Sequence, residues 1–226
     1  ECRMQYLCRF LGDEQAQPCG VCDVCTGERF PQPNEQLRRA ARMFEFHPPL
    51  NIDAKYKKEP LYVQSAALSF YGGTIVGETI KQCKYGAPPQ PFPDWIVERS
   101  ASLIRALLPP DALQGVVPIP STVSGNLVED FAARLAQQLG VPIRNALRKT
   151  RETQPQKEFT NSVQKAKNID GAFEAVESLS EQNLLVVDDV FDSGATLKEA
   201  GKILKQAGAG ALYAFCITRT RHRGDL

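Results

Sequence analysis

The stretch "LLVVDDVFDSGAT", from Leu184 to Thr196, carries the strongest structural signal in this chain of 226 residues. Four apolar residues lead into two adjacent acids, Asp188 and Asp189, and a loop of small and hydroxylated residues follows. A short apolar run bounded by turn residues is typical of a buried strand. Because unpaired charge is costly to bury, two acids at the end of such a strand predict that this end meets a polar ligand.

The segments around this stretch alternate between strands and amphipathic helices. Short apolar runs predict strands at residues 115–120 and 212–218, and helical spacing predicts helices within residues 71–86, 94–109, 128–140 and 196–209. In the first of these helices we expect Ile75, Ile80 and Cys83 to face the core. The alternation predicts an α/β fold with a parallel sheet covered by helices on both faces. In such folds the ligands lie outside the carboxyl ends of the strands.

The predicted turn into the last helix consists of Ser193, Gly194, Ala195 and Thr196. Its two small residues let a ligand approach the backbone, and the exposed amides of a helix start attract a phosphate. Its two hydroxyls add donors, while Asp188 and Asp189 can accept from vicinal hydroxyls, directly or through Mg²⁺. A phosphate beside a diol describes a ribose 5-phosphate. The structural alternative is that Asp188 caps the turn and Thr196 caps the helix.

This loop resembles the phosphoribosyl-pyrophosphate (PRPP) loop of type I phosphoribosyltransferases, and residues 61–220 resemble the ComF branch of that family. The motifs that carry the resemblance are "YGGTIVGETIKQCKYG", "VVPIPS", "LGVPIRNALRKTRETQPQKEFTNSVQKAKNIDGAF" and "LLVVDDVFDSGAT", in that order. The resemblance implies that Asp188 and Asp189 hold the ribose hydroxyls. It also implies that the backbone from Asp192 to Thr196 holds the 5-phosphate of PRPP or of a nucleotide monophosphate.

The same resemblance assigns three further parts of the site. A pyrophosphate corner is implied at Pro118, Ile119, Pro120 and Ser121. Asp192 is implied to lie near the base and to be the catalytic residue of an active transferase. The segment from Arg144 to Lys167, with seven cations and two acids, corresponds to the hood of the family. ComF relatives usually carry arginines after the Pro-x-Pro corner, whereas "STVSGNLVEDF" contains no cation. A pyrophosphate site without cations is expected to bind weakly.

A second motif lies at the other end of the chain, where five of the seven cysteines fall within the first 25 residues. Cys19, Cys22 and Cys25 follow one another at two-residue spacing, and Cys2 lies seventeen positions upstream of Cys19. Four thiolates at such spacing suit a tetrahedral, structural zinc ion in a reducing compartment. Three alternatives remain open: Cys8 in place of Cys2, an iron–sulfur cluster, or reduced thiols without metal. Cys8 lies on the apolar side of a predicted helix that ends at Gly12, so we expect it to pack instead.

The cysteine stretch resembles the zinc module that follows the motor domains of RecQ-family DNA helicases. "YLCRFLGD" and "CGVCDVC" carry this resemblance, which covers residues 1–27. It implies the ligands Cys2, Cys19, Cys22 and Cys25. The sequence opens at Glu1-Cys2 without an initiator Met and with this motif already under way, so we expect it to be a fragment of a longer protein. No segment matches the G-x-x-x-x-G-K-[ST] phosphate loop of a motor, so helicase activity would belong to the rest of that protein. The helicase motor domains of the same chain would then be a partner.

Residues 28–60 are expected to be a linker with one short basic helix. Arg38, Arg39 and Arg42 lie on one face of that helix, which is either solvated or in contact with DNA phosphates. Arg148, Lys149 and Arg151 are the candidate DNA contacts of the hood. The net charge of +1 indicates no partner by itself, and no apolar run approaches the roughly 18 residues that span a bilayer.

The resulting prediction is a small helical zinc module at residues 1–27, a linker, and a phosphoribosyltransferase-like domain at residues 61–226. We expect a cytoplasmic protein, associated with the nucleoid in a bacterium. Three functional hypotheses follow: a DNA-binding accessory region of a RecQ-like helicase, a nucleotide sensor in the same context, and an active PRPP-dependent transferase. Fold analogy does not choose among them.

Overall fold

A computed structural model describes residues 1–28, 34, 47–50, 52, 60–121, 125–152, 164 and 168–221. The chain divides into two compact units, Glu1–Phe46 and His47–Leu226. The predicted basic helix with Arg38, Arg39 and Arg42 lies outside the described residues. Within the described residues, no helix is both long and apolar enough to cross a bilayer.

The first unit contains two short helices, α1 (Arg3–Phe10) and α2 (Asp23–Thr26). The helix predicted between the cysteines is confirmed, and Gly12 follows it with a φ of 99°. No residue of α1 is buried and Cys8 is half-exposed, so the first unit does not bury the apolar side of α1 by itself. A unit of this size contains too little apolar surface to build a core around every helix.

The second unit is built on a four-stranded parallel sheet. Its strands are β1 (Gln64–Phe70), β2 (Gly115–Pro118), β5 (Leu184–Phe191) and β6 (Leu212–Arg219), and their order in the sheet is β1-β6-β5-β2. The parallel sheet is confirmed. β1 was not predicted from the sequence, because polar and apolar residues do not alternate regularly from Ser65 to Ser69 and two of these residues are alanines.

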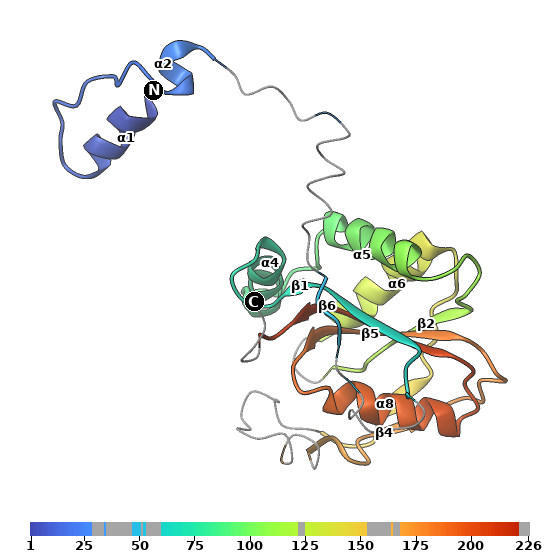
Figure 1. The fold of residues 1–226 in the computed structure, drawn as a ribbon. Helices are drawn as coiled ribbons and strands as arrows, with labels where there is room; N and C mark the ends of the chain where they lie inside the picture. The colour runs from blue at the N-terminus through green and yellow to red at the C-terminus, as the bar shows by residue number, and fades with distance from the viewer. Residues whose placement is uncertain are drawn as a thin grey trace. The chain divides into compact units, whose positions relative to one another are not determined.

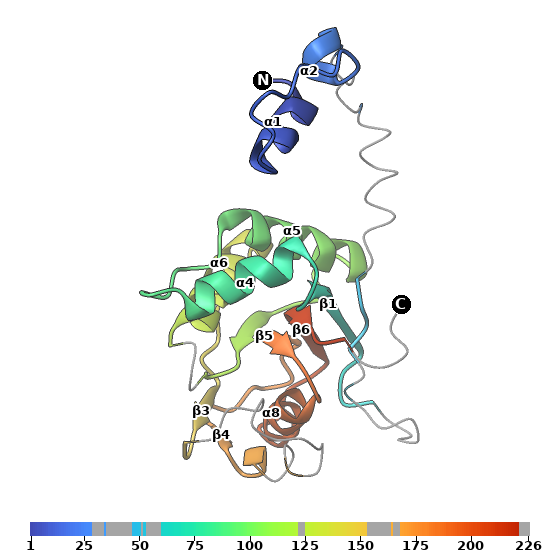
Figure 2. The same ribbon diagram turned by 90° about the vertical axis from the view of Figure 1, so that its left-hand side faces the viewer.

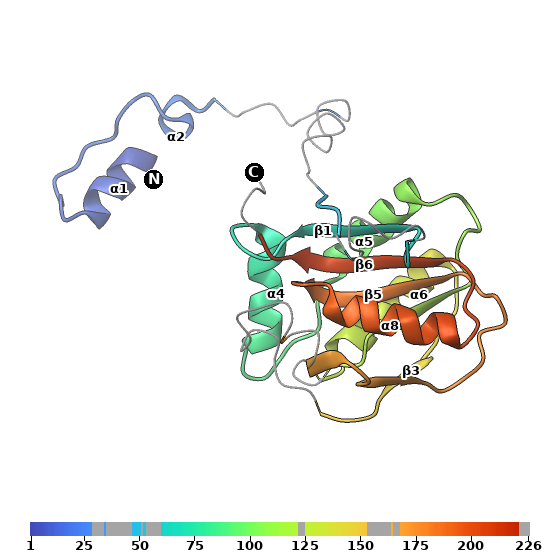
Figure 3. The ribbon, with the colours of Figure 1, turned by 60° about the horizontal axis from the view of Figure 1, so that its bottom comes forward.

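Helices and a small second sheet cover the two faces (Figures 1 and 2). One face carries α4 (Ile75–Tyr85), α5 (Asp94–Leu107) and α6 (Leu127–Leu139). The other face carries α8 (Ala195–Gln206) and the antiparallel pair β3 (Leu147–Lys149) and β4 (Phe173–Ala175). The cover on both faces agrees with the prediction. Figure 3 shows α4 at the carboxyl ends of the strands, where ligands of such folds lie.

Two apolar clusters hold these layers together. Val186 of β5 packs with Leu197 and Leu204 of α8, whereas Val187 packs with the helices of the opposite face. Ile80 and Cys83 of α4 are buried as predicted, but Ile75 is 80% exposed, so its predicted core position is wrong. Val76 is buried in its place, because it precedes Ile80 by four positions and therefore lies on the same face of the helix.

The segment from His47 to Leu50 belongs to the second unit and packs on its edge strand. Ala67 donates its amide to the Pro48 carbonyl at 3.0 Å, and Ser65 donates its hydroxyl to the Leu50 carbonyl at 2.8 Å. Leu50 is buried in the core on the α8 side. The sheet unit therefore begins before residue 61, within the segment that we expected to be a linker.

Candidate functional site

The two adjacent acids lie where β5 outruns its neighbour. β2 ends at Pro118, which pairs with Val187, and the Ile119 amide donates to the Val187 carbonyl at 2.9 Å. β5 continues to Phe191 beside β6 alone, so Asp188 and Asp189 follow directly after the point where β2 leaves the sheet. The predicted place of the acids, near the carboxyl ends of the strands, agrees with this geometry.

Asp188 and Asp189 point to opposite faces of the sheet, because successive side chains of a strand alternate. Val186 and Asp188 lie on the α8 face, whereas Val187 and Asp189 lie on the α4 face. The Asp189 carboxylate forms an ion pair of 2.7 Å with the Lys84 ammonium on α4. Only 8% of the Asp189 side chain and 12% of the Lys84 side chain are exposed. Asp189 is thus already bound to a cation of its own chain.

Asp188 is half-buried and accepts the Asp189 amide at 2.9 Å. Burial raises the pKa of Asp188 to about 7, and the neighbouring Asp189 charge adds to this rise. Lys149 on β3 lies near Asp188, on the α8 face of the sheet. Burial lowers the pKa of Lys149, whereas the negative charge of Asp188 raises it. An acid that titrates near neutrality beside a half-buried lysine is typical of a functional site.

The loop after β5 turns sharply into α8. Gly194 has a φ of 78° and is the residue before α8, and a Cβ on it would lie 3.1 Å from the Phe191 ring. The amide of Ala195 lies 3.5 Å from the Ser193 hydroxyl. Because the first amides of a helix have no acceptor within it, those of α8 are available to an anion. The cap position is Gly194 rather than Thr196, so the structural alternative for Thr196 is wrong.

Asp192 and the predicted pyrophosphate corner flank this loop. The Thr220 hydroxyl donates to the Asp192 carboxylate at 3.0 Å, which ties the loop to the end of β6. In the corner, Pro118 and Ile119 are buried, whereas Pro120 and Ser121 are half-exposed. Pro118 and Ile119 lie beside Val187 of β5, through the strand pairing and the Ile119 amide.

The candidate DNA contacts of the hood have partners within the domain. Arg148 forms an ion pair with Glu174 at 2.7 Å, and both side chains are exposed. Arg151 donates to the carbonyls of Asn168 and Asp170, each at 3.0 Å. Lys149 lies near Asp188, on the α8 face of the sheet.

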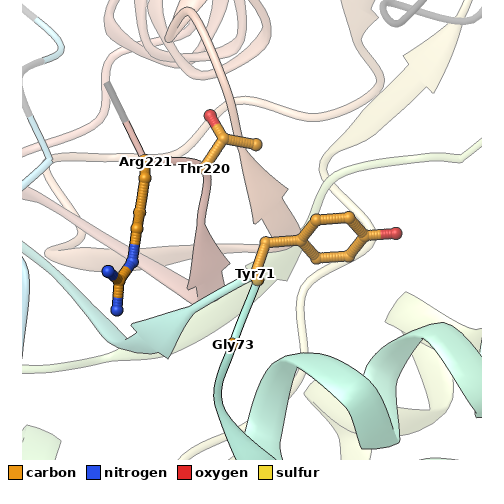
Figure 4. A pocket seen from close by; sticks show the side chains of 5 residues that line it. Tyr71, Gly73, Thr220 and Arg221 are labelled. Atoms are coloured by element: carbon orange, nitrogen blue, oxygen red, sulfur yellow. The ribbon is translucent and has the colours of Figure 1, made fainter. Parts of the chain in front are cut away.

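A cleft of about 390 Å³ lies at the carboxyl ends of β1 and β6. This cleft was not predicted from the sequence. Its lining residues are Tyr71, Gly72, Gly73, Thr220 and Arg221 (Figure 4). The side chains of Tyr71 and Arg221 point in different directions, so they do not converge on one ligand atom. Lys84 was also missed as a site residue, because its place at the end of a predicted helix gave no sign of a buried partner.

The first unit brings the four predicted cysteines together. The sulfur atoms of Cys2, Cys19, Cys22 and Cys25 lie within 4.8 Å of one another, and Cys8 lies outside this group. Bidentate contacts of 2.5 Å between Arg3 and Asp23 join the two helices around the cluster. The arrangement is a set of four soft donors that could hold one metal ion.

Backbone amides favour the thiolate form at two of these cysteines. The amide of Cys19 lies 3.2 Å from the Cys2 sulfur and is the main cause that lowers the pKa of Cys2 to about 6. The backbone of Arg3 has the largest effect in lowering the pKa of Cys22. Metals bind the thiolate rather than the thiol. The four sulfur atoms, grouped within 4.8 Å of one another, fit a thiophilic metal.

Comparison with known proteins agrees with this fold. Residues 129–224 match the family model described as "Phosphoribosyl transferase domain". The DNA utilization protein YhgH of Escherichia coli (strain K12) is 31% identical over 75 residues, which are 33% of this chain and 33% of that protein. The chain thus spans about a third of the length of this relative.

Two solved structures illustrate the similarity. A purine phosphoribosyltransferase from Pyrococcus horikoshii Ot3 is 18% identical, with a TM-score of 0.38 over 57% of this chain and 85% of that chain. The glutamine PRPP amidotransferase from B. subtilis is 17% identical, with a TM-score of 0.42 over 62% of this chain and 30% of that chain. The parallel sheet with its helices on both faces has the type I phosphoribosyltransferase fold, and residues 129–224 carry the sequence match to that domain.

Proposed function

We propose that the loop from Asp188 to Thr196 binds the ribose 5-phosphate part of a nucleotide, and that the domain is a nucleotide-sensing accessory region of a RecQ-like DNA helicase. The observation that carries this proposal is the geometry of the loop. A left-handed glycine starts α8 directly after a strand that bears a half-buried acid. The loop therefore combines an anion site with a hydrogen-bond acceptor within one turn.

Each group has one role in binding. The first amides of α8 and the hydroxyls of Ser193 and Thr196 donate to the phosphate oxygens. Asp188 accepts from a ribose hydroxyl on the α8 face, and Lys149 balances its charge. Gly194 keeps the backbone close to the phosphate, because its φ of 78° disfavours other residues and a Cβ there would lie only 3.1 Å from the Phe191 ring.

Binding without transfer is the proposed outcome at this site. PRPP carries a pyrophosphate that needs cations, and the residues from Pro118 to Asp130 include none. The Asp192 carboxylate accepts the Thr220 hydroxyl at 3.0 Å through one of its two oxygens. The alternative is an active PRPP-dependent transferase of ComF type, with Asp192 as the catalytic base.

The first unit supports the helicase context of the proposal. We assign a structural zinc ion to Cys2, Cys19, Cys22 and Cys25, since four thiolates leave no open position for chemistry. In this proposal the module stabilises motor domains elsewhere in the same protein.

DNA is the proposed macromolecular partner. The name of the E. coli relative refers to DNA utilization, and Arg148 is an exposed cation of the hood. Fluorescence anisotropy at low salt tests this part of the proposal: log affinity should fall with log salt by about 0.9 per phosphate contact on duplex DNA. Absence of binding at low salt would remove DNA from the proposal and leave the nucleotide site untouched.

Calorimetry tests the sugar-phosphate site. Ribose 5-phosphate and nucleotide monophosphates should bind, and PRPP should bind no more tightly. Asp188→Asn should weaken binding about 10- to 150-fold, because a hydrogen bond to a charged group contributes about 1.5–3 kcal/mol. Glu98→Gln, which changes an exposed acid on α5, is the matched control. A pyrophosphate-release assay with a panel of bases should show no turnover, whereas turnover with any base would establish the transferase.

A further inference from the structure

The buried ion pair between Lys84 and Asp189 has no role in the sequence prediction of the site. Its distance of 2.7 Å and the low exposure of both side chains make it the most enclosed ion pair among the described residues. Lys84 comes from α4, about 100 positions before Asp189, so the pair depends on tertiary structure. A buried pair of this kind demands a reason, because removing two charges from water is costly.

The place of α4 is set firmly by its first turn. The Thr74 hydroxyl donates to the Phe70 carbonyl at 2.6 Å and accepts the Gly77 amide at 3.0 Å. Gly77 lies so close to the end of β1 that a Cβ would meet the Tyr71 carbonyl oxygen at 2.2 Å. The helix is therefore anchored on the sheet, and Lys84 in its last turn is held over Asp189.

The charges at the end of β5 are already balanced by the chain itself. Asp189 faces Lys84, and Asp188 lies in the field of both Lys149 and Lys84. A divalent cation in proteins is held by oxygen ligands whose negative charge it neutralises. A magnesium ion beside Asp189 would instead meet an ammonium in direct contact with the same carboxylate, and like charges at such distances repel. The pair of acids therefore does not fit the Mg²⁺ that the type I phosphoribosyltransferase fold implies.

We propose that Lys84 is the built-in cation of this site, so that the acids of β5 bind no divalent metal and the sugar phosphate is bound without one. In this arrangement Asp189 is a positioning residue: it anchors α4 and orients β5, while Asp188 alone meets the sugar. The binding of a sugar phosphate without a metal rests on the proposed function, whereas the exclusion of a divalent metal from the acids does not.

Direct metal binding tests the exclusion without any sugar ligand. Mn²⁺ binding is followed by electron paramagnetic resonance on the zinc-loaded chain. The wild-type chain should bind no Mn²⁺ at the site, and Lys84→Gln should bind it at least tenfold more tightly than the wild type. Lys202→Gln removes an exposed lysine that pairs with Glu199 at 3.0 Å, and it should leave Mn²⁺ binding unchanged. Mn²⁺ binding by the wild type that Asp188→Asn or Asp189→Asn abolishes would overturn the inference, as would no gain in Lys84→Gln.

Calorimetry with ribose 5-phosphate then tests the consequence for the ligand. The wild-type affinity should agree within about twofold between EDTA and Mg²⁺. Lys84→Gln should bind weakly in EDTA and recover in Mg²⁺, while Lys84→Arg should resemble the wild type in both. Circular dichroism checks that each variant is folded. If Lys84→Gln does not fold, the comparison of the wild-type affinity in EDTA and in Mg²⁺ decides. A tenfold loss for the wild type in EDTA would overturn the inference and leave the proposed function intact. No binding in either buffer, with metal exclusion confirmed, would overturn the proposed function alone.

Discussion

At the scale of single residues, two neighbouring acids with similar sequence contexts have different environments. Asp189 is buried against Lys84, whereas Asp188 is half-buried and has its pKa raised to about 7. From the sequence, both were expected to hold hydroxyls of one sugar. Both lie near the end of β5, but alternation along this strand places their side chains on opposite faces of the sheet. Lys84, the partner that distinguishes Asp189 from Asp188, lies about 100 positions earlier in the chain. Spacing along the sequence does not reveal a contact over such a separation.

The raised pKa of Asp188 predicts a pH dependence of folding stability. Between about pH 4 and pH 7 the folded chain keeps the Asp188 proton, whereas the unfolded chain loses it near 3.8. Folding is therefore favoured by protons, and stability falls as the pH rises through this window and levels off above it. Lys84, Lys149 and Asp189 are the charges that face this group.

The check is denaturant unfolding of the wild type and Asp188→Asn at pH 5 and pH 8. At pH 8 the variant should be more stable than the wild type, by at most about 4 kcal/mol, because one pKa unit corresponds to about 1.4 kcal/mol. At pH 5, about 1.2 units above the pKa of the unfolded chain, the variant should be more stable by only about 1.7 kcal/mol. A difference that is constant over this range would contradict the assigned pKa.

At the scale of elements, the packing of α4 on the end of β1 depends on Gly77. A Cβ there would lie 2.2 Å from the Tyr71 carbonyl oxygen, and a backbone atom cannot move aside cheaply. Gly77→Ala should lower the free energy of unfolding by about 1–3 kcal/mol, as overpacking does. Gly72→Ala is the matched control, since nothing lies within 4 Å of its Cβ position, and it should change stability by less than about 0.5 kcal/mol. Equal effects of the two changes would contradict the close contact.

Prediction from the sequence succeeded for elements that have strong periodicity. The helix with Val128, Phe131 and Leu135 on one side and the strand from Leu184 are present with those residues buried. β1 was missed, because its alanines and serines resemble neither a strand nor a helix by pattern. Ile75 was misplaced, because helical spacing puts Val76, four positions before Ile80, on the buried face of α4 in its stead. The β3–β4 pair was also missed, since each strand has three residues and pairs only across a long loop.

At the scale of the whole molecule, the two units depend on different stabilising interactions. The sheet unit has an apolar core on each face of its sheet, whereas α1 of the first unit buries no residue. We therefore expect the first unit to need a metal ion in order to fold, because in such small modules metal binding and folding are coupled.

Metal analysis and thermal unfolding check this dependence. The chain should contain one zinc ion, and Cys22→Ser should lose it and unfold the first unit while the sheet unit melts at an unchanged temperature. Cys8→Ser, which alters a half-exposed thiol outside the cluster, should retain the zinc. Full zinc occupancy in Cys22→Ser would contradict the assigned ligands.

The central claim is that the start of α8 holds a phosphate next to Asp188. Its most direct test is a ¹⁵N NMR titration of the chain with ribose 5-phosphate, which locates binding residue by residue. The amides of residues 193–197 should shift most, together with that of Asp189, whose amide donates to Asp188. Shifts concentrated instead at Tyr71, Gly72, Gly73, Thr220 and Arg221, the residues of the neighbouring cleft, would contradict the claim, as would no shift at all.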